Sequence, residues 1–235
     1  MNWQDYWAAG RALSVQFANA RPFPYIVIDG FMPEDVAQKA LKACPTPDSS
    51  VWKGNDNPQT VNKSTIKYGD GVKDFCLSEQ ALDILQLLNG GPFMRFVCEL
   101  SQVELVPDPY FVEGAYHLVG NGGKLGIHAD FSHHPLTGLE RRLNLLWYLN
   151  PDWKEEYGGS LGLYEPDLKT GKSIAPLFNR AVIFATSDIS YHGHPEPMKL
   201  PEGVYRRSIA MYYYSLPRPE REKKTIQFPC PISAV

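Results

Sequence analysis

The chain has 235 residues, with 23 basic and 26 acidic side chains and a formal net charge of -3. This near balance argues against nucleic acid or an anionic membrane as the main partner, since neither would attract the protein through its overall field. Hydrophobic residues make up 43% and charged residues 21%, which is typical of a globular protein and excludes a disordered or fibrous chain. The length suits one generous domain or two small ones.

The sequence predicts neither a membrane anchor nor a secreted protein. No apolar run approaches the roughly 18 residues that a membrane span requires. The N-terminal residues carry an acid and three early aromatic side chains, without the continuous apolar segment of a secretory signal. The four cysteines are widely separated and form no Cys-X-X-Cys pair, which favours reduced thiols over a disulfide framework or a zinc site. We therefore expect a cytoplasmic protein.

The first part of the chain predicts a mixed, partly helical structure. Residues 22–31 are typical of a short apolar strand. A helix is predicted to begin at Pro33, because proline fits the first turn and the acids after it favour the positive end of the helix dipole. Two further helical patterns cover 79–88 and 93–100. The polar segment 45–75 predicts a long loop, which we expect to close over a substrate.

The pattern changes at about residue 110, where β-branched and aromatic segments alternate with loops rich in Gly, Asn, Pro and Asp. This spacing favours an antiparallel sandwich or barrel. With helices first and strands afterwards, we expect an α+β fold with helices packed on one side of a β core. We expect one domain over 1–235, with a helical or mixed support in 1–109, the core in 110–215 and a tail in 216–235. The strand-like segments are 110–119, 141–150, 158–165, 180–186 and 206–215.

A histidine and an aspartate two residues apart, His128 and Asp130, form the sharpest local feature. In an extended strand, residues two apart point to the same face, so the imidazole and the carboxylate can bind one ion together. His192 and His194 each offer a second imidazole. Two imidazoles and one carboxylate leave three positions open on an octahedral ion, which suits the Fe(II) of non-haem oxygenases. By itself, the pattern also fits an exposed histidine beside a turn aspartate.

Arg206 and Ser208 lie two apart at the start of the alternating run 206–215, so both side chains face the same way. A buried arginine is costly unless it meets an anion, and its planar guanidinium matches the two oxygens of a carboxylate. The small Ala210 on the same face leaves room, which favours Arg206 over Arg207 as the inward residue. The alternative is that both arginines lie on the surface of an edge strand.

Six segments between Tyr116 and Ser215 form an ordered set: GGKLGIHADF (122–131), RRLNLLWYLN (141–150), EEYGGSLGLYE (155–165), NRAVIFAT (179–186), SYHGHPEP (190–197) and RRSIAMYYYS (206–215). Together they resemble the Fe(II)/2-oxoglutarate-dependent oxygenases, in the prolyl-4-hydroxylase-like branch, and come in the order typical of that superfamily. The resemblance implies a double-stranded β-helix (jelly-roll) core with N-terminal supporting helices. It also implies an enzyme that uses Fe(II), 2-oxoglutarate and O2 to hydroxylate an unactivated C–H bond, with release of succinate and CO2. The expected substrate is proline, within a peptide or free, or a related small molecule.

The resemblance implies that three residues, His128, Asp130 and His192, are the iron ligands. Of the two late histidines it selects His192 over His194, because His192 precedes the small residue and the proline-containing loop of the motif. Imidazole and carboxylate ligands suit Fe(II), whereas thiolates would favour softer metals, and no cysteine lies near these motifs.

The resemblance also implies the contacts of the cosubstrate. Arg206 is expected to hold the far carboxylate of 2-oxoglutarate, with Tyr148 as a hydroxyl donor and Ser208 as a further contact. Period-two alternation places Asn144 and Tyr148 on one face, in agreement with this assignment. Leu125 stands where related proteins often carry tyrosine. Four further residues are expected to contact substrate or to support the centre: His117, His133, His134 and Asn144.

Two other functions fit part of the pattern. A zinc-dependent hydrolase of cupin-like fold could hold its metal with two histidines and one aspartate, but it leaves Arg206 and Tyr148 without a role. A non-catalytic jelly-roll binding module would carry a remnant site, whereas every ligand and carboxylate-binding position is present here. The sequence shows no evident second domain to recruit a protein target, which favours a small-molecule or peptide substrate.

Overall fold

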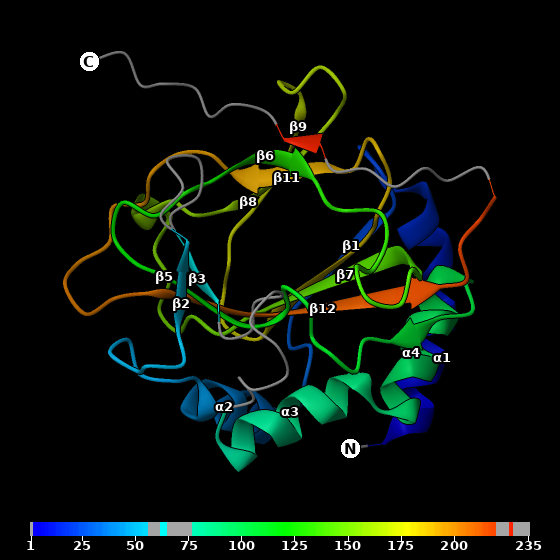
Figure 1. Ribbon diagram of the computed structural model, residues 1–235, viewed down its shortest axis with the longest axis horizontal. Coiled ribbons are helices and arrows are strands. Elements are labelled where there is room, and N and C mark those ends of the chain that lie inside the picture. The colour runs from blue at the N-terminus through cyan, green and yellow to red at the C-terminus, as the bar shows by residue number, and fades with distance from the viewer. Residues whose placement is uncertain (1, 56–61, 65–76, 220–225, 228–235) are drawn as a thin grey trace.

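The computed structural model describes residues 2–55, 62–64, 77–219 and 226–227. The helices gather in the first half of the chain, and most strands follow them (Figure 1). The α-helices are α1 (Trp3–Asn19), α2 (Glu34–Ala43), α3 (Glu79–Asn89) and α4 (Gly91–Ser101), with a 3₁₀ turn η2 (Glu155–Tyr157). The strands are β1 (Tyr25–Ile28), β2 (Lys53–Asn55), β3 (Asn62–Ser64), β4 (Val106–Pro107), β5 (Ala115–Val119), β6 (Leu125–Ala129), β7 (Glu140–Tyr148), β8 (Leu161–Tyr164), β9 (Gly171–Ile174), β10 (Arg180–Ala185), β11 (Tyr191–His194), β12 (Arg206–Ser215) and β13 (Ile226–Gln227).

Helices α2, α3 and α4 confirm the three helices that the sequence predicts, whereas α1 was not predicted. Trp7, Gly10 and Phe17 recur at helical spacing, a pattern that marks one face of α1. That face packs on α4, where a Cβ at Gly10 would lie 2.9 Å from the carbonyl oxygen of Phe96. Only glycine allows the two helices to approach this closely. The indole of Trp7 adds a hydrogen bond of 2.8 Å to the carbonyl of Pro92.

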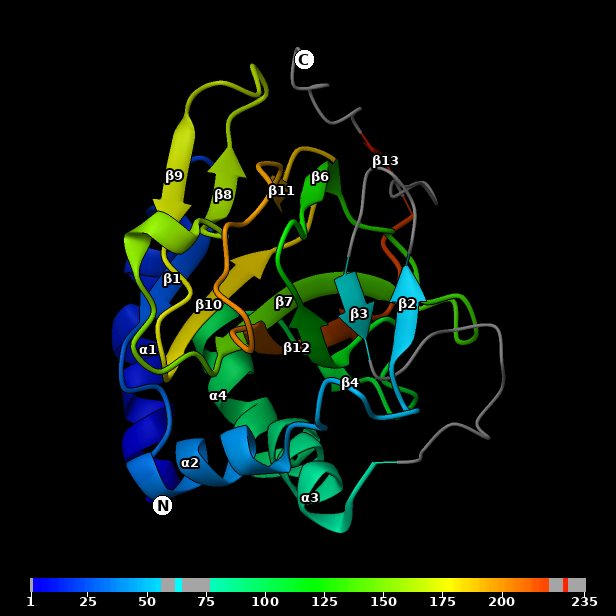
Figure 2. The same ribbon diagram turned by 90° about the vertical axis from the view of Figure 1, so that its left-hand side faces the viewer.

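The strands form two antiparallel sheets, and the smaller lies over one face of the larger (Figure 2). Within the described residues, the larger sheet has the order β1-β10-β7-β12-β5-β3-β2, with β4 beside β12, and the smaller has the order β13-β6-β11-β8-β9. The helices cover the outer face of the larger sheet, so they support the core from one side. This arrangement confirms the predicted jelly-roll core with supporting helices.

Alternation along β7 separates the two faces of the larger sheet. Leu143, Leu145 and Trp147 are buried and belong to the hydrophobic core that contains the helices. Asn144 and Tyr148, on the other phase, are buried toward the space between the sheets. The outer side chains therefore fix the sheet to the helices, and the inner ones are free to build a site.

The predicted loop over 45–75 is wrong at two places. Residues 53–55 and 62–64 are the strands β2 and β3, which pair with each other and extend the larger sheet beyond β5. Their polar sequence hides them from a hydrophobic pattern, because edge strands are often polar. The rest of the segment after residue 55, and with it the expected closure, lies outside the described residues, as do 220–225 and 228–235 of the predicted tail.

Asn179 joins the early segment of the chain to the larger sheet. Its Oδ1 accepts hydrogen bonds from the Met32 amide and the Trp147 indole, both 3.1 Å long, and its Nδ2 donates to the Met32 carbonyl over 2.7 Å. Asn179 is buried and has a φ of 57°, a region that asparagine tolerates better than most residues.

We expect Asn179→Ala to lower the free energy of unfolding by roughly 2–4 kcal/mol, because it leaves buried partners unpaired and strains the backbone. Urea denaturation followed by circular dichroism measures this loss. Asn19→Ala, at the exposed end of α1, is the control and should change the value by no more than about 0.5 kcal/mol. Equal effects of the two substitutions would contradict the structural role of Asn179.

Candidate metal centre and active site

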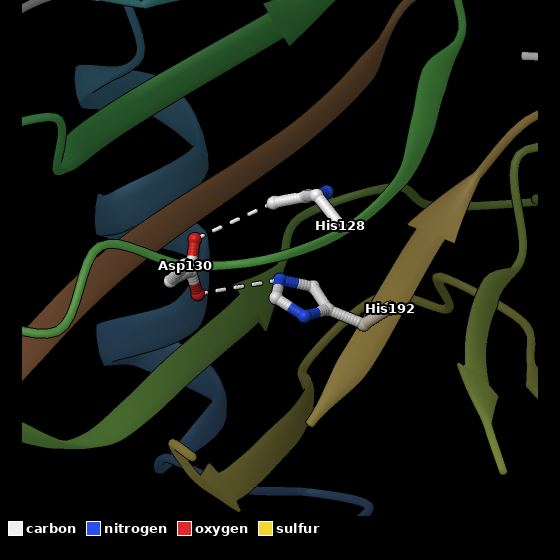
Figure 3. Close-up of side chains that lie close together, drawn as sticks. All are labelled: His128, Asp130 and His192. Atoms are coloured by element: carbon white, nitrogen blue, oxygen red, sulfur yellow. Dashed lines mark ion pairs between the residues drawn. The ribbon is translucent and has the colours of Figure 1, made fainter. Parts of the chain in front are cut away.

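His128, Asp130 and His192 converge between the two sheets. Their ligand atoms all lie within 4.8 Å of one another, and the described residues form no other such group of three. The Nε2 atoms of both histidines lie 3.4 Å from the carboxylate of Asp130, one at each oxygen. Figure 3 shows the two rings pointing toward the carboxylate. His128 and His192 are directly opposite in the pairing of β6 with β11, so the ladder itself fixes their separation.

The hydrogen bonds of the two rings prepare them to bind a cation. Nδ1 of His128 lies 2.9 Å from the Gly126 carbonyl, and Nδ1 of His192 lies 2.9 Å from the Ser190 carbonyl. A carbonyl only accepts, so each Nδ1 carries the proton and each Nε2 presents its lone pair to the centre. Two imidazole nitrogens and a carboxylate are the donor set that suits Fe(II), so these residues fit the metal that the sequence analysis implied.

Asp130 is held as a carboxylate by the groups around it. Its Oδ2 accepts a hydrogen bond of 2.6 Å from Asn144 and forms an ion pair of 3.1 Å with Arg141. Burial would raise the pKa of Asp130, but the charge of Arg141, aided by the two histidines, outweighs burial and lowers the pKa well below its usual range. The carboxyl group of Asp130 is therefore ionised at neutral pH without a metal.

The two histidines differ in their affinity for a proton. Burial lowers the pKa of His192 to about 4 and keeps this ring neutral. Burial also opposes the charged form of His128, but its contacts with Asp130 outweigh burial and raise the pKa. Of the two rings, His128 therefore has the higher affinity for a proton.

Arg141 is a site residue that the sequence analysis missed. Its side chain is only 1% exposed, and its guanidinium carbon lies 3.5 Å from the ring centre of Tyr212 and 4.5 Å from that of Phe131. Its Nε donates to Asn144 over 2.8 Å. The buried guanidinium thus holds both the carboxylate of Asp130 and the amide that bonds to it.

Arg206, Tyr148 and Ser208 lie at the same side of the centre, as alternation predicts. Arg206 is 5% exposed, and its Nε donates to the Gly159 carbonyl over 2.8 Å while Nη2 donates to the Tyr148 hydroxyl over 3.3 Å. Gly159 has a φ of +68°, and a Cβ there would clash with the side chain of Met198 and lie 3.2 Å from Cδ of Arg206, so glycine leaves room for both side chains. Ser208 pairs with Tyr148 across the strands.

The two buried arginines of this region differ in one respect. Arg141 has a carboxylate partner in Asp130. Arg206 forms no ion pair with any residue that the structure describes; it contacts the Gly159 carbonyl and the hydroxyl and ring of Tyr148. Because a buried cation without an anion is unfavourable, Arg206 is suited to bind an anionic ligand.

One cavity of about 80 Å³ joins the metal-binding side chains to Arg206 and Ser208. Both sheets contribute to its walls. Besides those residues, the described lining includes His117, Arg141, Asn144 and His194. A ligand that spans from the metal to Arg206 would therefore stay within a single buried space.

The structure brings together some of the predicted substrate residues and separates others. His117 lines the cavity and bonds to the Glu113 carbonyl over 3.1 Å, and burial lowers its pKa to about 4. His133 bonds to Ser132 and, within the described residues, is absent from the cavity lining. His134 is likewise outside the lining; it is buried, and both its ring nitrogens are bonded.

His134 has a structural role in the loop that follows Asp130. Its Nε2 donates to Asp108 over 3.1 Å, and its Nδ1 accepts from the amides of Leu136 and Thr137. These bonds use both nitrogens of the ring, so the side chain stabilises the loop. Adjacency to the metal motif in sequence therefore does not place His134 in the site.

His194, the other candidate for the second imidazole, lies outside the group of metal-ligating atoms but lines the same cavity. The pairing of β11 with β6 is irregular between the two histidines: His192 lies opposite His128, whereas His194 lies opposite Leu125. This bulge adds a residue to β6, so both Leu125 and His128 face the cavity. Burial lowers the pKa of His194 well below its usual value, and the charge of Arg206 contributes.

Comparison with known proteins identifies relatives of this chain. Residues 114–214 match the model of the 2OG-Fe(II) oxygenase superfamily. The chain is 36% identical over 207 residues to prolyl 3-hydroxylase OGFOD1 of Xenopus laevis, and 37% identical over 86 residues to that of Mus musculus. These alignments cover 85% and 34% of this chain, but only 37% and 15% of the relatives. The chain thus spans little more than a third of the length of the Xenopus laevis relative.

Solved structures share the fold. A prolyl-4-hydroxylase from Pseudomonas putida has a TM-score of 0.60 and 15% identity, over 88% of this chain and 98% of that one. A prolyl hydroxylase from Trichoplax adhaerens, in complex with a hypoxia inducible factor peptide fragment, has a TM-score of 0.59 and 20% identity, over 90% and 91%. None of the helices among the described residues has the length and apolar character to cross a membrane. Residues 114–214 of the chain thus match the 2OG-Fe(II) oxygenase superfamily, and the fold is similar to that of solved prolyl hydroxylases.

Proposed function

We propose that this protein is an Fe(II)- and 2-oxoglutarate-dependent dioxygenase that hydroxylates a proline within a peptide. The single observation that carries the proposal is the shared cavity: three metal-ligating side chains and a buried arginine without a carboxylate partner among the described residues line one space. A metal and a dianionic cosubstrate satisfy both features at once. A zinc hydrolase would leave the arginine unused.

Each residue has a distinct task in this proposal. His128, Asp130 and His192 hold Fe(II) on one side and leave its other side open. Arg206 binds the far carboxylate of 2-oxoglutarate, with hydroxyl groups of Tyr148 and Ser208 beside it. When bound, Fe(II) and 2-oxoglutarate supply the oxidation: one atom of O2 enters the C–H bond of the substrate, the other enters succinate, and CO2 leaves.

The protein supplies the surroundings of this chemistry. Arg141 and Asn144 keep the carboxylate of Asp130 ionised and fixed, so the ligand needs no reorganisation when a metal enters. The bonded Nδ1 atoms of His128 and His192 fix the ring orientation in the same way. The buried cavity limits the access of water, which would otherwise compete for the metal and weaken the ion pairs.

Proline is the proposed substrate because the relatives named above are prolyl hydroxylases. A peptide is favoured over the free amino acid because one structural neighbour was solved with a peptide fragment. This substrate class is independent of the metal and cosubstrate site, since this fold changes its substrate through loops around a constant centre.

The proposed function is tested by 2-oxoglutarate turnover. Purified protein with Fe(II), ascorbate and O2 should convert 2-oxoglutarate to succinate and CO2 slowly alone and at least about 10-fold faster with a suitable proline-containing peptide, because substrate binding completes the site. Succinate release measures the first reaction. A mass gain of one oxygen on the peptide measures the second.

Two outcomes would contradict the proposal. If the Fe(II)-loaded protein neither binds nor turns over 2-oxoglutarate, the oxygenase assignment is wrong, and hydrolysis with zinc would then favour the hydrolase. If 2-oxoglutarate is converted but only free amino acids gain oxygen, the peptide part of the proposal is wrong. His133→Ala is the control for 2-oxoglutarate turnover, because His133 follows His128 and Asp130 in the sequence but is absent from the described cavity lining.

A further inference from the structure

Resting on the proposed function, we propose that His194 donates a hydrogen bond to the carboxylate of 2-oxoglutarate that Arg206 holds. Arg206 comes from β12 of the larger sheet, and His194 comes from β11 of the smaller sheet. The cosubstrate would then be bound from both sheets, and the far carboxylate would contact two nitrogen-bearing side chains. His194 would thus help to select a dicarboxylic keto acid.

His194 lies in the cavity where the cosubstrate is proposed to bind. Its side chain lines the same cavity as Arg206 and the metal-binding residues, and the residue is 5% exposed. Its ligand atoms do not belong to the group that His128, Asp130 and His192 form, so it is available to a second ligand. A position inside the cavity but outside the metal centre is the position of a cosubstrate contact.

His194 also differs from the other histidines in its hydrogen bonds. All six histidines lie in the described part of the chain, and only His194 has a buried ring nitrogen, Nδ1, without a hydrogen-bond partner there. The Nδ1 atoms of His128 and His192 bond to main-chain carbonyls, and His134 bonds through both nitrogens. Buried polar atoms are nearly always paired, so the exception points to a partner that the polypeptide does not provide.

The residue opposite His194 explains why the polypeptide provides no partner. Leu125 is its cross-strand neighbour, and it also lines the cavity. A leucine side chain has no polar atom, so the facing wall cannot bond to the ring. An anion bound at Arg206 can accept from the imidazole as well as from the guanidinium, which satisfies both buried groups.

The test compares two keto acids of equal chain length. 2-Oxoglutarate has the far carboxylate, and 2-oxovalerate has a methyl group in its place. In the Mn(II)-loaded protein without O2, titration calorimetry should show that His194→Leu weakens 2-oxoglutarate binding on the order of 10-fold, since a hydrogen bond to a charged group is lost. Binding of 2-oxovalerate should change less than about 2-fold. His194→Asn or His194→Gln, which keep an N–H donor, should recover most of the loss.

The matched control is Lys172→Ala, which removes a lysine from the outer groove beside His194 but does not touch the inner cavity. Its 2-oxoglutarate affinity should equal that of the natural protein. Unchanged affinity in His194→Leu, or equal weakening of both keto acids, would overturn the inference. Loss of Mn(II) binding in His194→Leu would also overturn it, because His194 would then act on the metal. If the natural protein binds no 2-oxoglutarate, the proposed function itself fails.

Discussion

Asp130→Asn is expected to weaken Fe(II) binding by at least about 100-fold and to abolish 2-oxoglutarate turnover. The amide keeps the size of the side chain but removes the charge that binds the metal, and removing even an outer contact of a metal site costs about 10–100-fold. The substitution also leaves the buried Arg141 without its carboxylate partner. We therefore expect the metal-free variant to lose roughly 3 kcal/mol of its free energy of unfolding.

A second substitution separates these two effects. In Asp130→Asn/Arg141→Met, the buried charge is removed together with its partner, and an apolar chain of similar length fills the space between Tyr212 and Phe131. The double variant should regain most of the lost stability, because breaking a buried pair is worse than replacing it. It should regain none of the metal affinity.

Urea denaturation of the metal-free proteins measures stability, and Fe(II) or Mn(II) titration measures metal affinity. If Asp130→Asn binds metal as tightly as the natural protein, Asp130 is not a ligand. If the double variant is less stable than Asp130→Asn, the pair with Arg141 is not the source of the instability.

Arg206→Ala is expected to weaken 2-oxoglutarate binding by about 100-fold, while metal binding is retained. A charge-assisted, two-point contact with a carboxylate contributes about 3 kcal/mol, and every 1.4 kcal/mol changes affinity tenfold. Arg206→Lys keeps the charge but not the planar geometry. Its affinity for 2-oxoglutarate should therefore fall between those of Arg206→Ala and the natural protein. Calorimetry with the Mn(II)-loaded protein measures both.

The neighbouring arginine offers a matched control for this variant. Arg207 has the opposite phase of β12 and contacts the Tyr205 carbonyl, so Arg207→Ala should leave 2-oxoglutarate binding within about 2-fold of the natural value. Equal losses in Arg206→Ala and Arg207→Ala would show that the effect is non-specific. An unchanged affinity in Arg206→Ala would remove the cosubstrate role from Arg206.

Alternation made much of the site predictable from the sequence. In a regular strand, residues two apart lie on the same face. Once one polar residue is assigned to the inner face, the other residues of that face follow by counting in steps of two. This placed Asn144 with Tyr148, and Arg206 with Ser208, without knowledge of the sheet. The helices α2, α3 and α4 were predictable for a similar reason, because their apolar residues and end signals repeat at helical spacing.

Arg141 was not predictable, because a bulge breaks the alternation between it and the rest of β7. The partner of Tyr213 is Leu143, but the partner of Tyr214 is Arg141, so Arg142 is an extra residue in β7. Counting by two from Leu143 would point Arg141 toward the helices, whereas it faces the cavity. A bulge depends on the pairing of distant strands and leaves no local signal.

The structural contacts of His134 were not predictable for a related reason. Its neighbours in sequence include Asp130, but its partner Asp108 lies in the turn before β5. The hydrogen bonds that make it structural depend on how two loops meet. Sequence spacing does not predict a contact between two loops. The proximity of His128 and His192, by contrast, follows from the regular pairing of β6 with β11.

The pairing of His128 with His192 links the metal to the assembly of the fold. The two rings are cross-strand neighbours, although long stretches of chain, including β7, β8 and β10, separate them in sequence. An unfolded chain therefore has no preformed chelate, and a cation bound by these residues would act as a removable cross-link that only the native state can accept. The binding free energy of such a cation would add to the stability of the native state, so the strand pair that brings the two rings together would also be the place where the metal stabilises the fold.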